Sequence, residues 1–157
     1  MRIGVLSDTH DNLPKIKKAV SFLNRKNVDF VLHAGDFVAP FVIPYLDKLK
    51  PKWAGVFGNN DGERKGLSKA SKRKIKEGPL RMSFSGKKIL LVHDKSLVNL
   101  RKETAQVIIF GHTHRPEITK TDGKLWFNPG ECSGWLSSVS TVGIIDLSSL
   151  SAKIYKI

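Results

Sequence analysis

The 157-residue chain has little cysteine, few acidic residues and no long apolar segment. Its single cysteine, Cys132, excludes an intrachain disulfide framework and is compatible with a reducing compartment. No apolar run approaches the roughly 20 residues that a membrane-spanning helix needs, so we expect no membrane partner. The length suits one domain with a hydrophobic core, and we expect residues 1–157 to form a single domain.

Basic residues outnumber acidic residues by 27 to 14, and the formal net charge is +13. A basic segment, residues 64–102, holds 13 basic residues against Glu77 and Asp94, and so carries +11 of this charge. Its densest part, residues 65–76, has too few apolar positions for a core helix and is expected to be a solvated helix or a mobile loop. The charge alone indicates attraction to polyanions, whether nucleic acid, anionic lipid or a phosphorylated small molecule.

Short apolar runs indicate the fold class. Five runs are rich in strand-forming residues and are quickly followed by glycine or a polar residue, which is typical of buried strands. They are residues 3–6, 30–32, 53–57, 89–92 and 107–110. Apolar residues at helical spacing separate the first three runs, at 16–23 and 41–49, and Asp11 or Asn12 can cap the first helix. This order predicts a βαβαβ unit with parallel strands in an α/β domain.

The C-terminal third has a different pattern. Strand-like runs there are separated by turn residues, and Asp122-Gly123 between two such runs is a strong hairpin signal. The runs are residues 117–121, 125–128, 139–147 and 152–157. We expect this part to be richer in antiparallel sheet.

Polar side chains follow each of the five apolar runs. Parallel strands deliver such side chains to one edge of a sheet, where ligands bind. Carboxylate, imidazole and amide groups suit divalent transition metals, and two neighbouring ions need a shared anionic ligand. Asp36 is the best bridging candidate, because Gly35 allows a tight turn before it. The predicted metal ligands are Asp8, His10, Asp36, Asn59, His93, His112 and His114.

Together these motifs resemble the signature of the calcineurin-like metallophosphoesterases, and the resemblance runs essentially end to end. The motifs are Asp8-x-His10, Gly35-Asp36, Gly58-Asn59-x-Asp61, His93 and Gly111-His112-x-His114. The short length and the Asn128-Pro129-Gly130 segment look most like the small prokaryotic phosphodiesterase branch. The resemblance implies a two-sheet β-sandwich flanked by helices, a four-layer α/β/β/α arrangement with a dimetal site at the carboxyl ends of the strands. One metal would be held by Asp8, His10, Asp36 and His114, and the other by Asp36, Asn59, His93 and His112.

The implied activity is that of a metal-dependent phosphoesterase, and a phosphodiesterase fits best. A hydroxide bridging two divalent metal ions would attack the phosphorus of a phosphoester substrate. Mn²⁺ is the expected ion, with Ni²⁺, Co²⁺, Fe or Zn²⁺ as alternatives. No Gly-x-Ser-x-Gly or phosphate-loop pattern offers a side-chain nucleophile. The predicted catalytic residues are Asp36, Asn59, Asn60 and Asp61.

Two positions depart from the family pattern. Many members have a histidine at the position of Asn60, thought to protonate the leaving group. An amide cannot do so, and alkoxide leaving groups then lose roughly 10²–10⁴-fold in assistance. This favours good leaving groups and diesters over monoesters. Asp94 stands where glycine is common, and is either a solvated loop residue or a carboxylate that binds metal or acts as the acid.

Three further residues allow two interpretations each. His33 either orients Asp36 or packs at a strand end, and the packed histidine is favoured. Arg115 either reaches a phosphate or is a surface charge. Cys132 lies in a tight turn near the predicted site and is expected to be a packing residue instead of a nucleophile.

Two other functions stay open. The basic segment, used as a backbone-tracking surface, would support a nuclease-like activity on nucleic acid, which predicts a steep salt dependence. A non-catalytic protein-interaction scaffold of the same fold, as in one retromer subunit, is disfavoured because every ligand position is filled. The first candidate ligand is already Asp8, so we expect no signal peptide and a cytoplasmic location. A homo-oligomer is compatible with the sequence.

Overall fold

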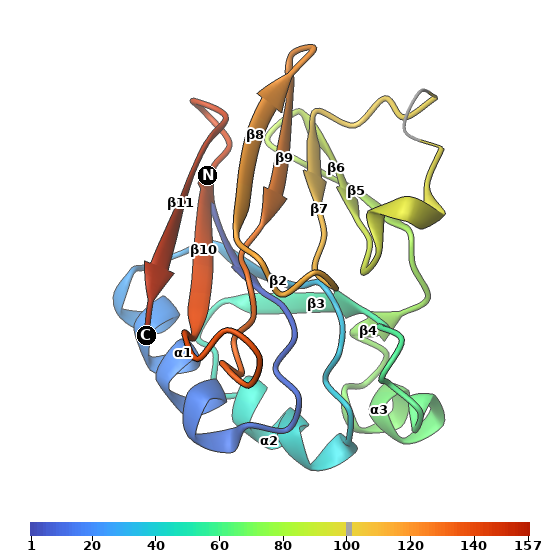
Figure 1. Cartoon of the computed structure of the whole chain (residues 1–157), viewed down its shortest axis with the longest axis vertical. Helices are drawn as coiled ribbons and strands as arrows, with labels where there is room; N and C mark the ends of the chain where they lie inside the picture. Colours follow the sequence, from blue (N-terminus) through green and yellow to red (C-terminus); the bar gives the residue numbers. More distant parts are fainter. Residues whose placement is uncertain (100–101) are drawn as a thin grey trace.

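The computed structural model describes residues 1–99 and 102–157, which form two β-sheets with helices on one side (Figure 1). The strand order is β11-β10-β1-β2-β3-β4 in the six-stranded sheet and β5-β6-β7-β9-β8 in the five-stranded sheet. One apolar cluster joins both sheets, with Val5 and Leu32 from the first and Leu91 and Ile109 from the second. The predicted two-sheet sandwich is confirmed.

The six-stranded sheet contains the predicted βαβαβ unit. Its parallel strands are β1 (Arg2–Leu6), β2 (Phe30–His33), β3 (Lys52–Val56) and the short β4 (Ile75–Lys76). The connections are α1 (Leu13–Arg25), the 3₁₀ turn η1 (Pro40–Val42) with α2 (Ile43–Leu46), and α3 (Arg64–Ala70). At the other edge, β10 (Thr141–Asp146) and β11 (Ser151–Lys156) are antiparallel, as expected for the C-terminal strands.

Local sequence explains the two connecting helices. Asn12 caps α1, because its side-chain oxygen accepts a hydrogen bond from the Lys15 backbone N–H at 3.3 Å. The apolar face of α1 is buried against the sheet, with Ile16 and Leu23 fully covered. The helix predicted over 41–49 is shorter than expected. The segment forms a 3₁₀ turn followed by a single α-helical turn, and Pro40 and Pro44 lie in the first turn of these two elements, where a missing backbone N–H is tolerated.

The five-stranded sheet carries the remaining predicted strands. Its members are β5 (Leu80–Phe84), β6 (Lys87–Leu91), β7 (Val107–Ile109), β8 (Glu117–Thr121) and β9 (Lys124–Asn128). The β8–β9 hairpin turns at Asp122-Gly123, as predicted, and both residues have positive φ. However, β9 runs parallel to β7, so the C-terminal third is mixed and not purely antiparallel.

Both outer faces of the sandwich are covered. Helices α1 and α2 lie on the six-stranded sheet. On the five-stranded sheet, Val98, which follows the 3₁₀ turn η2 (Lys95–Leu97), and Ala105 pack with Leu90 and Phe110. Within the described ranges, no helix has both the length and the apolar character needed to cross a bilayer. The five strands predicted to precede ligands are thus divided between the sheets, with β1–β3 in one and β6 and β7 in the other.

The basic segment is folded. Residues 65–76, expected to be a solvated helix or a mobile loop, form most of α3, a turn, and β4. Leu67 anchors α3 because it is fully buried, and Ile75 anchors β4 in the same way. Residues further along build β5, β6 and η2. Arg101, which belongs to the segment, lies outside the described residues.

Candidate metal centre

The strand ends bend sharply where the predicted ligands lie. Five of these ligands have a backbone φ between 39° and 67°, a region that residues other than glycine seldom adopt. They are Asp8, His10, Asp36, His112 and His114. Such residues cost on the order of 1–3 kcal/mol each and persist where the surrounding structure holds them, as at functional sites. The neighbouring chains also pack closely: a Cβ at Gly58 would overlap the Asp36 carboxylate.

A first cluster joins Asp8, His10, Asp36 and His114. One ligand atom from each residue lies within 4.8 Å of the others. His114 Nε2 lies 3.5 Å from Asp8 Oδ1, and His10 Nε2 lies 3.5 Å from Asp36 Oδ2. The structure therefore brings together all four residues that the sequence predicts for one metal.

The first cluster contains buried polar atoms that lack a partner. Within the described part of the chain, neither Asp8 oxygen nor His10 Nε2 has a hydrogen bond, although all three are buried. Burial also raises the pKa of Asp8, because a desolvated carboxylate is costly to keep charged. Buried polar groups are normally satisfied, so these atoms fit a cation that they would ligate.

A second cluster converges on the Asn59 side-chain oxygen. His93 Nε2 lies 2.8 Å and His112 Nδ1 lies 2.9 Å from Asn59 Oδ1. The other ring nitrogen of His93 lies 2.8 Å from the Ala34 carbonyl oxygen, to which it donates. A neutral His93 therefore points a lone pair, not a proton, at the Asn59 oxygen. Electron-pair donors that face one another at this distance also fit a cation.

Asp36 belongs to both clusters. Its Oδ2 atom lies 3.5 Å from His10 Nε2 in the first cluster and 3.5 Å from His93 Nε2 in the second. The carboxylate is only 1% exposed. Asn60 holds it in place, donating from its backbone N–H to Oδ1 at 2.8 Å and from its side-chain amide to Oδ2 at 2.7 Å. Asp36 thus lies between the two clusters.

The comparisons with known proteins agree with this geometry. Residues 1–150 match the calcineurin-like phosphoesterase superfamily domain. The chain belongs to this family. It is a metal-dependent phosphoesterase, and the first cluster is a group of residues that could hold a metal ion.

Relatives of this phosphoesterase cover nearly its whole length. The chain is 37% identical over 154 residues to a phosphodiesterase of Methanocaldococcus jannaschii. The alignment covers 93% of each chain. A solved structure of an archaeal phosphodiesterase matches with a TM-score of 0.93 and 35% identity over 100% of both chains. A phosphoesterase from E. coli shares the fold, with a TM-score of 0.76 and 19% identity over 100% of this chain and 98% of the other.

The Asp61 carboxylate supports the phosphoesterase site from behind. It is buried and accepts backbone hydrogen bonds from Asp36 at 3.1 Å, Val38 at 2.7 Å and Gly58 at 2.7 Å. These bonds hold the chain that carries Asp36 against the turn that carries Asn59. The structure therefore places Asp61 among backbone amides, whereas Asn60 directly contacts the Asp36 carboxylate.

Asp94 is neither a free loop residue nor part of the clusters. One oxygen accepts a hydrogen bond from the Ser96 N–H at 2.8 Å and so caps η2. The other oxygen lies 3.8 Å from His112 Nε2, the ring nitrogen that faces away from Asn59. Burial raises the pKa of Asp94, but the hydrogen bonds from Ser96 and the nearby His112 lower it by more. The pKa of Asp94 is therefore below its usual value. Asp94 stays ionised beside His112.

Glu131 contacts the site and was not predicted. Its fully buried carboxylate lies 2.9 Å from His114 Nδ1 and accepts hydrogen bonds from Ser133 Oγ at 3.0 Å and from the Leu136 N–H at 3.0 Å. Burial raises the pKa of Glu131, but hydrogen bonds from Ser137, His114 and Leu136 lower it by more, so that the pKa is about 2. The carboxylate therefore fixes the His114 ring with Nε2 free to face Asp8. The available signal was an acidic residue inside the turn after Asn128-Pro129-Gly130.

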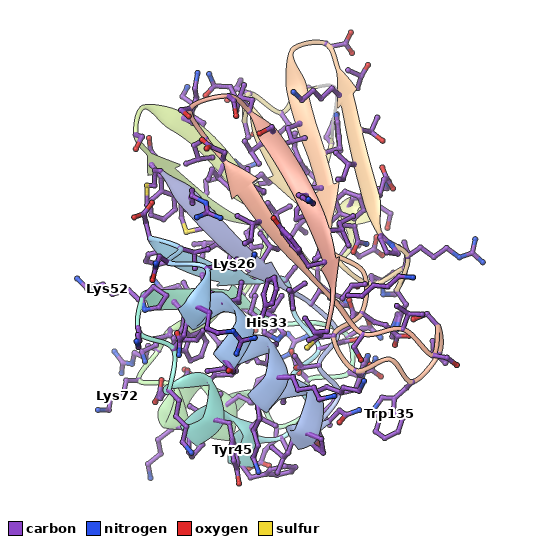
Figure 2. All side chains as sticks on the ribbon, turned by 90° about the vertical axis from the view of Figure 1, so that its left-hand side faces the viewer. Lys26, His33, Tyr45, Lys52, Lys72 and Trp135 are labelled. Atoms are coloured by element: carbon purple, nitrogen blue, oxygen red, sulfur yellow. The ribbon has the colours of Figure 1, made fainter. Side chains whose placement is uncertain are left out.

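The loop that Glu131 anchors also reaches His10. Trp135 projects from the edge of the molecule with 65% of its surface exposed (Figure 2). Its ring N–H donates to the His10 carbonyl oxygen at 3.2 Å. The start of the loop is tied to β1, because the Cys132 N–H donates to the Ser7 carbonyl oxygen at 2.9 Å.

His33 is a packed residue, as the favoured interpretation held. It lies in the interior (Figure 2), and its ring stacks on Phe37 with the centroids 3.7 Å apart. Its Nδ1 accepts from the Gly35 N–H, and its Nε2 lies 3.1 Å from Thr9 Oγ1. Burial lowers the pKa of His33 well below 6.5, so the ring is neutral. Arg115 is exposed, as a surface charge would be.

Cys132 should be inert to alkylation in the folded protein. It is fully buried, and burial raises the pKa of its thiol to about 12. The reactive thiolate is therefore scarce at pH 8. We expect iodoacetamide to leave the native chain unmodified over hours and to label it fully in denaturant, as measured by intact mass. Rapid labelling under native conditions would show that the turn opens.

Proposed function

We propose that this phosphoesterase hydrolyses phosphodiesters with two Mn²⁺ ions. Asp8, His10, Asp36 and His114 hold one ion, and Asp36, Asn59, His93 and His112 hold the other. The observation that carries the proposal is the position of Asp36 Oδ2, 3.5 Å from a histidine nitrogen in each cluster. The phosphodiesterase activity of the Methanocaldococcus relative, at 37% identity, supports the choice of substrate class.

The chain's own residues prepare the site for this reaction. When bound, two divalent ions supply positive charge for the phosphoryl oxygens and make water acidic enough to act as a nucleophile near neutral pH. Asn60 holds both oxygens of Asp36, so its amide is engaged away from a leaving group. The Ala34 carbonyl and the Glu131 carboxylate orient the rings of His93 and His114. The strand-end backbone therefore presets the ligand geometry before any ion arrives.

Asn60 cannot donate a proton as a general acid, and this favours esters whose leaving groups need no protonation. With Mn²⁺ we expect kcat/KM for bis(4-nitrophenyl) phosphate to exceed that for 4-nitrophenyl phosphate by about tenfold or more. A chelator should remove both activities, and Mn²⁺ should restore them. Release of 4-nitrophenolate measures each rate.

The control for this prediction is Asn60→His. It introduces an imidazole at the position of the amide and should raise monoester turnover relative to diester turnover. Equal rates for the two esters in the unmodified protein would contradict the role of position 60. Activity that survives complete metal removal would contradict the dimetal proposal itself.

We further propose a single domain over residues 1–157, supported by the length of the chain, and a cytoplasmic location, supported by its single cysteine. The preference for Mn²⁺ rests on the oxygen and imidazole donors of both clusters, which contain no thiolate. Comparing rates with Mn²⁺, Ni²⁺, Co²⁺, Fe²⁺ and Zn²⁺ after chelation tests this preference.

A further inference from the structure

A cavity of about 440 Å³ opens beside the second cluster. Asn59, His93 and His112 form the wall that it shares with the metal centre. Its volume lies within the range of small-molecule binding sites. A phosphoester whose phosphate rests on the two clusters would therefore direct one of its two arms into this cavity.

Much of the remaining wall is apolar. Phe57, Pro79, Val92 and Leu97 line it. Leu97 is 77% exposed, more than any other large apolar side chain among the described residues. Contact between water and an exposed leucine side chain is unfavourable. A flat apolar group that covered Leu97 would bury this surface and so bind favourably.

The charged residues in the wall leave no free cation there. The Arg64 guanidinium binds both oxygens of Glu77, at 3.0 Å and 2.9 Å, and also donates to the backbone oxygens of Gly58 and Asp61. Asp94 adds a second carboxylate to the same wall. Glu77 and Arg64 neutralise each other, so Asp94 leaves the wall with one uncompensated carboxylate, which disfavours a negatively charged arm.

Two other basic residues of the segment also form ion pairs. Arg81 lies 2.9 Å from Glu103, and Lys95 lies 3.0 Å from Glu117. The basic segment therefore contributes Arg64 to the cavity wall, and Glu77 balances the charge of this guanidinium. This disfavours a nucleic-acid backbone in the cavity, because such a chain requires unpaired basic side chains.

We propose that this cavity binds one arm of the phosphodiester and selects an uncharged aromatic group. Leu97 and Phe57 supply the apolar contact, and Asp94 disfavours arms that carry negative charge. The proposal rests on the proposed phosphodiesterase function and adds the substrate class to it: diesters with at least one neutral, flat substituent.

Competitive inhibition by phosphate diesters that differ only in their arms tests this selection. The inhibitors are dimethyl phosphate, diphenyl phosphate and bis(4-carboxyphenyl) phosphate, measured against Mn²⁺-dependent turnover of bis(4-nitrophenyl) phosphate. We expect diphenyl phosphate to have an inhibition constant at least about tenfold lower than those of the other two. In Leu97→Asn, which removes the apolar contact without adding charge, this advantage should fall about fivefold or more. Leu97→Met, which keeps an apolar side chain at the same position, should retain the advantage.

The outcomes separate this inference from the function on which it rests. No turnover of the diester with any of the five metals would overturn the proposed function. Normal turnover with equal inhibition constants for the phenyl and methyl diesters would overturn the aromatic arm alone. Tighter binding of the carboxyphenyl diester would point to a polyanionic substrate instead. Because Leu97 is exposed, we expect its variants to fold like the unmodified protein, so a change in inhibition reflects binding. Circular dichroism of each variant checks that it is folded.

Discussion

Asp36→Asn should lower kcat for diester hydrolysis by about 10³-fold or more. Asparagine keeps the size of the side chain but removes the negative charge that lies between the two clusters. The ions would then repel each other without an anion to screen them. Metal analysis of the purified protein after dialysis should fall from two ions per chain to one or none.

A matched control is Asp122→Asn, which makes the same chemical change at the tip of the β8–β9 hairpin. Asp122 is exposed and lies in a turn whose positive φ asparagine also tolerates. Its activity and metal content should match those of the unmodified protein. If Asp36→Asn retained two ions and full activity, Asp36 would not be the shared ligand.

Glu131→Gln should weaken metal binding by about 10–100-fold, although the proposed ligand set is untouched. The carboxylate fixes the His114 ring through Nδ1, 2.9 Å away, and makes the ring a better electron-pair donor. A neutral amide loses the second effect and can present its N–H group to the ring in place of an acceptor. Titration calorimetry of the metal-free protein with Mn²⁺ measures the dissociation constant directly and does not depend on turnover.

Acid should reveal the same carboxylate in the metal-free protein. The pKa of Glu131 is about 2 in the folded chain against 4.5 as a reference, so its ionised form stabilises the fold above pH 4.5. This stabilisation, at most roughly 3 kcal/mol, is lost as pH falls from 4.5 through 2. Glu131→Gln should therefore be less stable than the unmodified protein at pH 6, and the gap should narrow toward pH 2. Urea unfolding at each pH measures it, and a gap independent of pH would argue against a buried ionised Glu131.

Much of the metal centre could be predicted because its residues follow strands. Asp8, Asp36 and His93 come shortly after buried apolar runs, and the ends of parallel strands meet at one edge. The chemistry of these side chains then identified a cation site. What the pattern of runs could not show is that β1–β3 and β6–β7 belong to different sheets. That arrangement came only from the family resemblance.

Features that depend on distant contacts were beyond prediction from local pattern. Glu131 precedes a cysteine in a turn, and only the fold places its carboxylate against His114. The net charge of the basic segment likewise did not show which basic residues form ion pairs. Arg81 pairs with Glu103 and Lys95 with Glu117, in each case 22 residues further along the chain. The segment 41–49 forms part of η1 and the single turn of α2 instead of one helix, a division that its apolar spacing did not indicate.

The division of the strand ends between two sheets has a consequence for the whole molecule. Asp8, Asp36 and Asn59 follow strands of the six-stranded sheet, whereas His93 and His112 follow strands of the five-stranded sheet. An ion held by residues from both sides is a cross-link between the two halves of the sandwich. The apolar layer joins the two sheets at their centre, and bound metal would join them again at one edge. The stability of the sandwich would then depend on the concentration of metal around the protein.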